Sequence, residues 1–406
     1  MLARPGHVGS GLGNEPWWKH AVVYQVQREA SNDQTDFKAL AVRIDAFKSL
    51  GVDALLLPAP DLPAPGTNAA MPSFDDLENL LRRASSHGIR VLLTIHAANA
   101  TDDLSGTARF WLTRGVAGLY IAPAPGSSPQ DEQVIIDKLR KLASTFAGQR
   151  IVVSDLDATS PAPPPRGRTP QSAKSSTLQI DTRADHLATL DAASLRPLLA
   201  ETQQNLLLDL HASSSLAQAV AAIAILGHPS TLIDSSANLV LEPTPEPVAA
   251  PEEPAKPAAA APAQPPTGTY LPYVPYVPPT KPKPAVEPKP IPMDPLTAWY
   301  KQLFDLNHGN AVLRSGSKTL LDFDAQNTLV WIIRPAAGSV RTPPVVVAIN
   351  LSGSPVQLSL ADAIKKLGLR GFFLRTLLRS DHGMGAQDIQ AVNVGAFGVY
   401  IGELRF

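Results

Sequence analysis

Five aspartates stand at or near the ends of apolar runs between residues 150 and 235, and their carboxylates could carry chemistry. They are Asp155, Asp157, Asp181, Asp209 and Asp234. Carboxylates at strand ends can form a general acid/base pair or hold a metal ion. The structural alternative is that such aspartates cap the following helix or bind loop amides. No two of the five have a spacing that singles them out as a pair.

Eight short apolar runs must position these aspartates. Because the runs are continuous rather than alternating, they indicate a sheet buried on both faces, which requires parallel strands joined by helical crossovers. The runs are AVVYQV (21–26), DALLLP (53–58), RVLLTI (90–95), GLYIAP (118–123), RIVVSD (150–155), TLQIDT (177–182), NLLLDLH (205–211) and STLIDS (230–235).

Amphipathic segments lie between the runs. DFKALAVRIDAFKSLG has Phe37, Leu40, Ile44 and Phe47 at helical spacing and stops at Gly51, and FDDLENLLRRASSHG stops at Gly88. Eight strand and helix units predict an α/β fold, the (β/α)8 TIM barrel. A doubly wound open sheet is the alternative, because periodicity alone does not show closure.

The composition divides the chain. The segment 243–294 is rich in proline and cannot build a packed core, so it is predicted to be a linker or an insertion. It could serve as a spacer or as a ligand for a proline-recognising groove. Asp294 is predicted to be the N-cap of the last barrel helix, and Pro295 its first residue. The predicted organisation is a flexible N-terminus at 1–16, the barrel at 17–242, the linker, the last helix at 295–310 and a small antiparallel β-sandwich at 311–406.

Charge and composition limit the partners. The net charge of −1 gives no basic footprint for nucleic acid or an anionic membrane. No stretch has the roughly 18 apolar residues of a membrane span, and no signal peptide is visible, so the prediction is a cytoplasmic protein. The chain has no cysteine, no glycine-rich phosphate loop and no paired histidines, and no cofactor is predicted.

Several segments together resemble the α-amylase family of glycoside hydrolases. In this order and at these spacings they are jointly specific, although each is weak alone. The segments are WWKHAVVYQV, DFKALAVRIDAFKSLGVDALLLPAP, HGIRVLLTIHAANATDD, ARFWLTRGVAGLYIAPA, NLLLDLHASSS and PLTAWYKQLFDLNHGNAVLRSG. The resemblance implies cleavage or transfer at α-glucosidic bonds with retention, by one nucleophilic carboxylate and one acid/base carboxylate.

Most of the catalytic residues that the resemblance implies are replaced in this sequence. The family's arginine and aspartate nucleophile on the fourth strand correspond to Tyr120 and Ala122, and a methyl group cannot attack an anomeric carbon. The acid/base glutamate falls on Asp155, whose side chain is one methylene shorter. The third carboxylate corresponds to Ala212. The third-strand aspartate is Thr94, and the asparagine and histidine after it align with Ala98 and Asn99, so the family's calcium is not expected.

Some residues could still contact a sugar. His211 matches the family's sugar-contacting histidine, with Asp209 beside it, and His96 could flank the same pocket. Tyr24 could stack on a sugar ring or be a core aromatic. Trp17 and Trp18 are expected to pack over the end of the barrel.

Three hypotheses about function follow. The first is a catalytically degenerate α-amylase-like protein, a pseudoenzyme that binds an α-glucan, a malto-oligosaccharide or a partner protein. The second is an active glycosidase or glucan-modifying enzyme that uses Asp155 and a displaced carboxylate. The third is an interaction scaffold that acts through the proline-rich linker.

Overall fold

A computed structural model of the chain describes residues 16–26, 35–60, 73–96, 104–122, 128–156, 179–181, 190–200, 206–208, 210, 215–228, 230–235, 239, 294–322, 327–335 and 342–406. The side chains of Pro129, Asp155, Leu156, Gln179, Asp181, Leu206 and Leu208 lie outside this description. Apart from Pro16 and Asp294, the expected N-terminal segment 1–16 and the proline-rich segment 243–294 lie outside the described residues, and their roles stay predictions.

Eight parallel strands form the first sheet, one for each apolar run. They are β1 (Val22–Gln25), β2 (Ala54–Pro58), β3 (Arg90–His96), β4 (Gly118–Ala122), β5 (Ile151–Leu156), β6 (Gln179–Asp181), β7 (Leu206–Leu208) and β8 (Thr231–Asp234). Their order is β7-β6-β5-β4-β3-β2-β1-β8, and β7 also contacts β8. The order follows the sequence all the way round and does not reverse at a switch point, so the sheet is a (β/α)8 barrel and not a doubly wound sheet.

The two faces of the barrel strands bury separate clusters. Inward residues such as Val23, Leu56 and Leu92 form the barrel interior, with Trp18 closing it. Outward residues such as Val22 and Leu55 pack against the surrounding helices. Both faces are apolar, which explains why the runs in the sequence are continuous and do not alternate.

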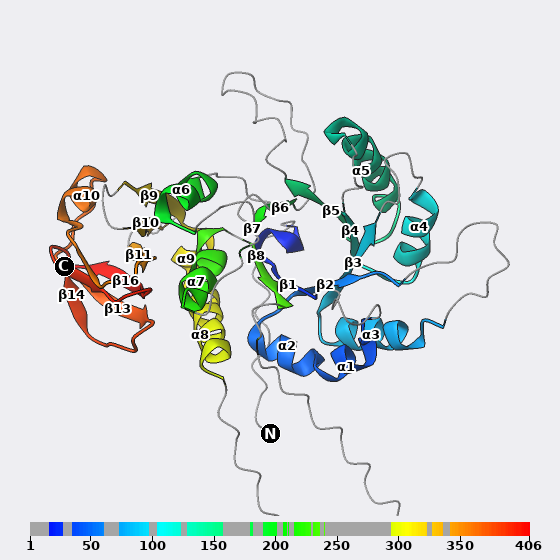
Figure 1. Cartoon of the computed structure of the whole chain (residues 1–406), viewed down its shortest axis with the longest axis horizontal. Coiled ribbons are helices and arrows are strands. Elements are labelled where there is room, and N and C mark those ends of the chain that lie inside the picture. The colour runs from blue at the N-terminus through cyan, green and yellow to red at the C-terminus, as the bar shows by residue number, and fades with distance from the viewer. Residues whose placement is uncertain are drawn as a thin grey trace, which may run out of the picture. The chain divides into compact units, whose positions relative to one another are not determined.

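Helices cover the outside of the barrel, and Figure 1 shows α1 to α5 along the outside of β1 to β5. A 3-10 helix, Trp17–His20, precedes β1. The α-helices of the barrel are α1 (Phe37–Val42), α2 (Ile44–Leu50), α3 (Asp75–Ser86), α4 (Ser105–Thr113), α5 (Pro129–Ala143), α6 (Ala192–Ala200), α7 (Ala217–Gly227) and α8 (Pro295–Gly309).

Local sequence signals fix the ends of these helices. The Asp294 carboxylate accepts hydrogen bonds from the N–H groups of Leu296 and Thr297, both at 3.1 Å, and Pro295 is the first helical residue of α8, as predicted. Gly51 ends α2 with a φ of 95°, which glycine adopts without strain. The helix predicted as one piece is two, because Arg43 donates its N–H to Leu40 three residues back and breaks the α-helical pattern between α1 and α2.

The C-terminal part is antiparallel. A six-stranded sheet has the order β14-β13-β16-β11-β10-β9, and β12 pairs with β15. The elements are α9 (Ala311–Ser315), β9 (Ser317–Leu321), β10 (Thr328–Arg334), β11 (Val345–Asn350), β12 (Val356–Leu358), α10 (Ala361–Lys366), β13 (Phe373–Arg379), β14 (Ala386–Asp388), β15 (Val392–Val394) and β16 (Val399–Arg405). The predicted antiparallel β-sandwich is confirmed.

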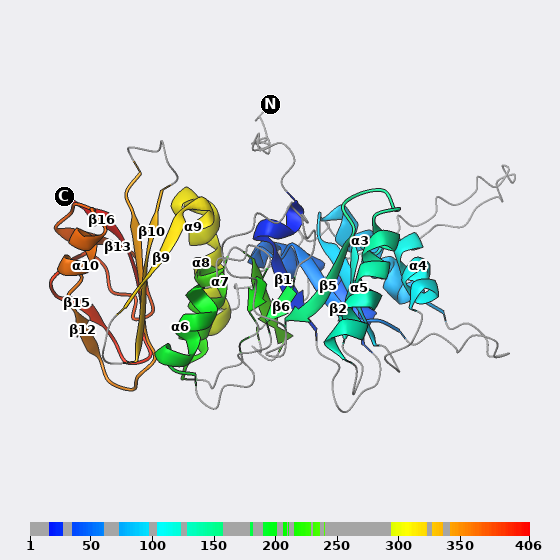
Figure 2. The same ribbon diagram turned by 90° about the horizontal axis from the view of Figure 1, so that it is seen from above.

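The six-stranded sheet is buried on both faces in its centre. One face, with Val330 and Val346, packs against β12, β15 and α10. The other face, with Trp331 and Val347, joins the cluster that holds the barrel helices, and Figure 2 shows α6, α7 and α8 beside this sheet. The barrel and the sandwich belong to one compact unit.

Polar contacts add to this packing. The Arg196 guanidinium of α6 forms an ion pair with Asp322, and the Ala192 N–H donates to the side chain of Asn327 at 2.6 Å. The Lys318 ammonium of β9 donates to the carbonyl oxygen of Gly227 at the end of α7. In the part of the chain that the structure describes, no helix has both the length and the apolar character needed to cross a bilayer.

Gly118 is predicted to be required by the barrel interior. A Cβ at this position would lie 2.6 Å from the Ile151 carbonyl oxygen and 2.9 Å from a Leu92 methyl carbon. We expect Gly118→Ala to lower the free energy of unfolding by about 1–3 kcal/mol, because backbone must move. Gly106→Ala in α4 is the control, since nothing lies within 4 Å of its Cβ position, and we expect no loss of stability. Equal urea midpoints for the two variants would contradict this account of the interior.

Lys318 is predicted to make stability depend on pH. Burial lowers the pKa of its ammonium from 10.5 to about 8. Between these values the unfolded chain binds the proton and the folded chain does not, so the free energy of unfolding gains up to about 3 kcal/mol as pH rises through this window. Lys318→Met should lack this gain, because it has no group to titrate.

The measurement is urea denaturation of both chains at pH 7.5 and 10. Burial raises the pKa of Tyr24 and of Tyr400, so their ionisation at high pH favours unfolding and opposes the rise in the free energy of unfolding. The parent chain and Lys318→Met both contain these tyrosines, so the difference between the two chains reports on Lys318. The same pH dependence in both chains would show that Lys318 is not the cause.

Candidate functional site

The carboxyl-terminal mouth of the barrel is the candidate site, because barrel enzymes place their reacting groups there. Strand alternation and the two apolar clusters define which side chains face the interior. At the mouth these inward positions are Gln25 on β1, Pro58 on β2, Thr94 and His96 on β3, Tyr120 and Ala122 on β4, and Asp234 on β8.

The fourth strand carries the position that the family resemblance assigns to the nucleophile. Ala122 ends β4 and is 8% exposed, and it lies opposite His96, whose side chain is exposed. Tyr120 lies opposite Thr94 and packs on the interior cluster. The ring of Tyr120 and the methyl group of Ala122 thus occupy the β4 side of the mouth. The methyl group, at the position that the resemblance assigns to the nucleophile, cannot form a bond to an anomeric carbon.

The first and eighth strands bring together two polar side chains that the sequence did not pair. Gln25 lies opposite Asp234, which is 5% exposed. The Gln25 side-chain oxygen is buried, and among the described residues it has no hydrogen-bond partner. A buried acceptor without a donor is costly, so this oxygen is free to accept a hydroxyl of a ligand. The sequence does not show which face of β1 is inward, because Val22, Val23 and Tyr24 are all apolar and buried.

Tyr24 faces the helices. Its ring lies 4.9 Å from that of Phe47 in α2, and the side chain is 7% exposed within the cluster that holds the barrel helices. Burial raises its pKa, as does the negative charge of Asp234, and both effects also raise the pKa of Tyr300 in α8. Tyr24 is therefore a core aromatic, the alternative that its sequence position left open, and a sugar ring could not stack on its buried face.

The two tryptophans of the N-terminal segment, Trp17 and Trp18, lie at the end of the barrel opposite the mouth. Trp18 is 6% exposed in the interior cluster, and Trp17 packs against the same cluster. Both tryptophans precede β1 in the 3-10 helix, at the amino-terminal ends of the strands. They pack over the end of the barrel, as expected.

The remaining predicted site residues stay predictions. Asp155 lies in β5 opposite Ile180, and Asp181 ends β6 opposite Leu208, but the side chains of both aspartates lie outside the description. The residues that lie outside it entirely are Ala98, Asn99, Asp157, Asp209, His211 and Ala212.

The chemistry of the described mouth is that of a hydrogen-bonding surface. Of the inward side chains described there, Asp234 carries the one carboxylate, whereas retaining glycoside cleavage needs two carboxyl groups about 5–5.5 Å apart. No three described histidine, aspartate or glutamate side chains are grouped so that they could hold a metal ion. Amide, hydroxyl, imidazole and carboxylate groups can all bind sugar hydroxyls.

Comparison with known proteins gives similarity in structure but not in sequence. No protein-family profile matches the chain, and no curated protein sequence matches it significantly. The chain is similar to the isomaltulose synthase of Klebsiella sp. LX3, with a TM-score of 0.61 and 11% identity over 96% of this chain and 100% of that chain. It is similar to the trehalulose synthase MutB of Pseudomonas mesoacidophila MX-45, with a TM-score of 0.61 and 14% identity over 97% and 100%.

Two further structures extend the comparison. The trehalose-6-phosphate hydrolase of Bacillus licheniformis has a TM-score of 0.61 and 14% identity over 97% of this chain and 100% of that chain. A MutB variant in complex with its substrate sucrose has a TM-score of 0.61 and 13% identity over 97% and 100%. These enzymes are α-amylase family members. The chain has the fold of that family, a (β/α)8 barrel followed by an antiparallel β-sandwich, as the sequence motifs predicted.

Proposed function

We propose that the protein is an α-amylase-like pseudoenzyme that binds an α-glucoside at the barrel mouth without cleaving it. The observation that carries the proposal is Ala122 at the end of β4, where the resemblance places the nucleophile. The missing carboxylate matters most, because removing one member of a cooperative catalytic set removes most of the rate.

The change at Tyr120 fits the change at Ala122. An arginine beside a lost aspartate would leave a cation in the barrel without its counter-ion, which is strongly unfavourable. Tyr120 instead adds an aromatic ring to the interior cluster. The two replacements are compatible with each other and with a folded barrel, and together they remove both the nucleophile and the cation that would stand beside it.

Binding is proposed from the groups that remain. Gln25 offers a buried oxygen without a described donor, and Asp234 lies beside it. According to their names, the similar proteins synthesise isomaltulose or trehalulose or hydrolyse trehalose 6-phosphate, and one is bound to its substrate sucrose. An α-glucosidic sugar is therefore the proposed ligand class. His211 and Asp209 remain proposed contacts from the resemblance.

The alternative to a pseudoenzyme is an active glycosidase or glucan-modifying enzyme, and the position of Asp155 favours it. Asp155 stands near the end of β5 opposite Ile180 of the interior cluster, a position from which it could act with a displaced carboxylate. A protein partner and a scaffold role for the proline-rich segment remain further proposals from the sequence.

Calorimetric titration with maltotetraose, isomaltulose and sucrose at millimolar concentration tests the proposal. We expect saturable heat for at least one sugar and no continuing heat, because binding without turnover stops at equilibrium. Continuing heat that disappears in Asp155→Asn would contradict the pseudoenzyme and support the alternative. Absence of any heat would contradict the binding role.

Gln25→Leu tests the location of binding. We expect the affinity for the bound sugar to fall by about three- to tenfold, the value of one hydrogen bond of roughly 0.5–1.5 kcal/mol. Gln133→Leu is the matched control, because Gln133 lies on the exposed face of α5 and bonds Asp137 at 2.9 Å. Unchanged affinity in Gln25→Leu, with saturable binding retained, would place the sugar elsewhere.

A further inference from the structure

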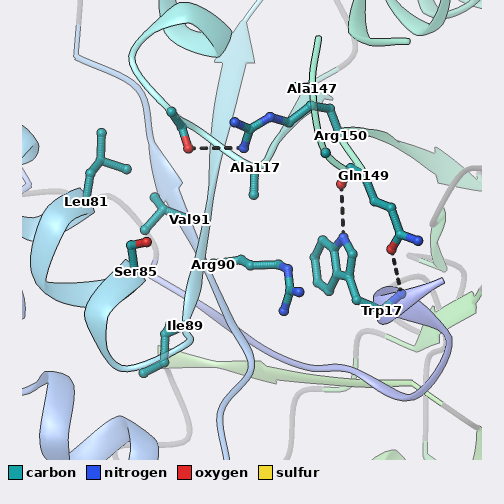
Figure 3. Close-up of a pocket in the computed structure, with 12 residues that line it drawn as sticks. Trp17, Leu81, Ser85, Ile89, Arg90, Val91, Ala117, Ala147, Gln149 and Arg150 are labelled. Atoms are coloured by element: carbon teal, nitrogen blue, oxygen red, sulfur yellow. Dashed lines mark hydrogen bonds between the residues drawn. The ribbon is translucent and has the colours of Figure 1, made fainter. Parts of the chain in front are cut away.

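A cavity lies at the amino-terminal ends of the strands, the end of the barrel away from the mouth. Its volume is about 370 Å³, within the range of small-molecule sites. It is formed by the starts of β3, β4 and β5 together with α3 and the 3-10 helix, and Figure 3 shows its lining. The sequence predicted no binding site here, because the lining residues come from five separate segments.

The charge of this cavity is positive. Arg90 and Arg150 both line it, and none of the lining residues has a carboxylate. The net charge of the chain is −1, so the two arginines do not reflect a generally basic surface. Two guanidinium groups in one cavity without a lining acid are the arrangement that recognises phosphate or carboxylate.

Arg150 has donors to spare. One terminal nitrogen, Nη1, donates to the carbonyl oxygen of Gly115 at 3.2 Å, which fixes the direction of the guanidinium; the bond is dashed in Figure 3. The Nε atom is buried, and no described residue accepts its hydrogen bond. Partial burial lowers the pKa of Arg150, a sign that its charge is incompletely solvated. An anion would supply both the acceptor and the counter-charge.

Arg90 is held in place by an aromatic ring. Its guanidinium carbon lies 4.5 Å from the centroid of the Trp17 ring, and Trp17 is itself fixed by its indole N–H, which donates to the Gln149 carbonyl oxygen at 3.1 Å. No described carboxylate lies within ion-pair distance of Arg90. Partial burial lowers the pKa of Arg90, and the negative charge of Asp53 acts in the opposite direction. One Asp53 oxygen already accepts from the Val22 N–H at 3.0 Å.

We propose that this cavity, the Arg90–Arg150 pocket, binds the phosphate or carboxylate group of a small molecule. Arg90 and Arg150 supply the positive charge that attracts the anionic group. The side chains of Ile89, Val91 and Ala117 contact the uncharged remainder, since the cavity is larger than a free phosphate ion needs. The site is separate from the barrel mouth and does not depend on the function proposed for the mouth.

Calorimetric titration of the full chain with inorganic phosphate and, separately, with succinate tests the pocket, at constant ionic strength kept by sodium chloride. We expect saturable binding of at least one anion. Binding of phosphate would identify a phosphate group as the ligand, and binding of succinate a carboxylate group. Arg150→Met and Arg90→Met should each weaken it by at least about tenfold, the value of a charge-assisted hydrogen bond. Methionine keeps the apolar stem that packs beneath each guanidinium.

Arg82→Met is the matched control. Arg82 lies on α3 close to the pocket in sequence, but it is exposed, bonds Asn79 at 3.2 Å and does not line the cavity. We expect its affinity to stay within about twofold of the parent chain, because Arg82 does not line the pocket and its charge is screened from the anion. Thermal unfolding verifies that each variant folds. If Arg150→Met unfolds because it loses the hydrogen bond to Gly115, the affinity of Arg90→Met still tests the pocket. No saturable heat in the parent chain, or an equal loss in Arg82→Met, would overturn the proposal.

Discussion

Close packing inside the parallel barrel is the constraint on which the rest of the structure depends. At Gly118 the strands β3, β4 and β5 leave no room for a Cβ atom, since the Ile151 carbonyl oxygen and a Leu92 methyl already fill the space. This packing sets the register of β4, and the register sets which side chains reach the mouth. Tyr120 and Ala122 face inward because Leu119 and Ile121 face the helices.

The same constraint limits how such a site can change. A barrel interior tolerates uncharged groups of suitable volume, but an unpaired charge there costs several kcal/mol. The tyrosine and alanine on β4 keep the interior free of unpaired charge, and the barrel and its β-sandwich are retained around them. The fold by itself does not establish a function.

The sequence predicted the elements better than the directions of side chains. All eight barrel strands, the Gly51 stop and the Asp294 cap follow from local signals that the structure confirms. The face on which Tyr24 lies did not follow, because strands that are apolar on both faces carry no polar alternation to orient them. Gln25 and the Arg90–Arg150 pocket were missed for a related reason: their partners come from distant segments that only the closed barrel brings together.

The central claim is that the barrel mouth has no nucleophile, and covalent trapping tests it most directly. A retaining α-glucosidase incubated with 5-fluoro-α-glucosyl fluoride accumulates a glycosyl ester on its nucleophilic carboxylate, which intact-protein mass spectrometry detects. The account predicts that the mass of this chain stays unchanged under conditions that label an active retaining enzyme. A mass increase of one fluoroglucosyl group, mapped to a peptide that contains Asp155, Asp181 or Asp234, would contradict it.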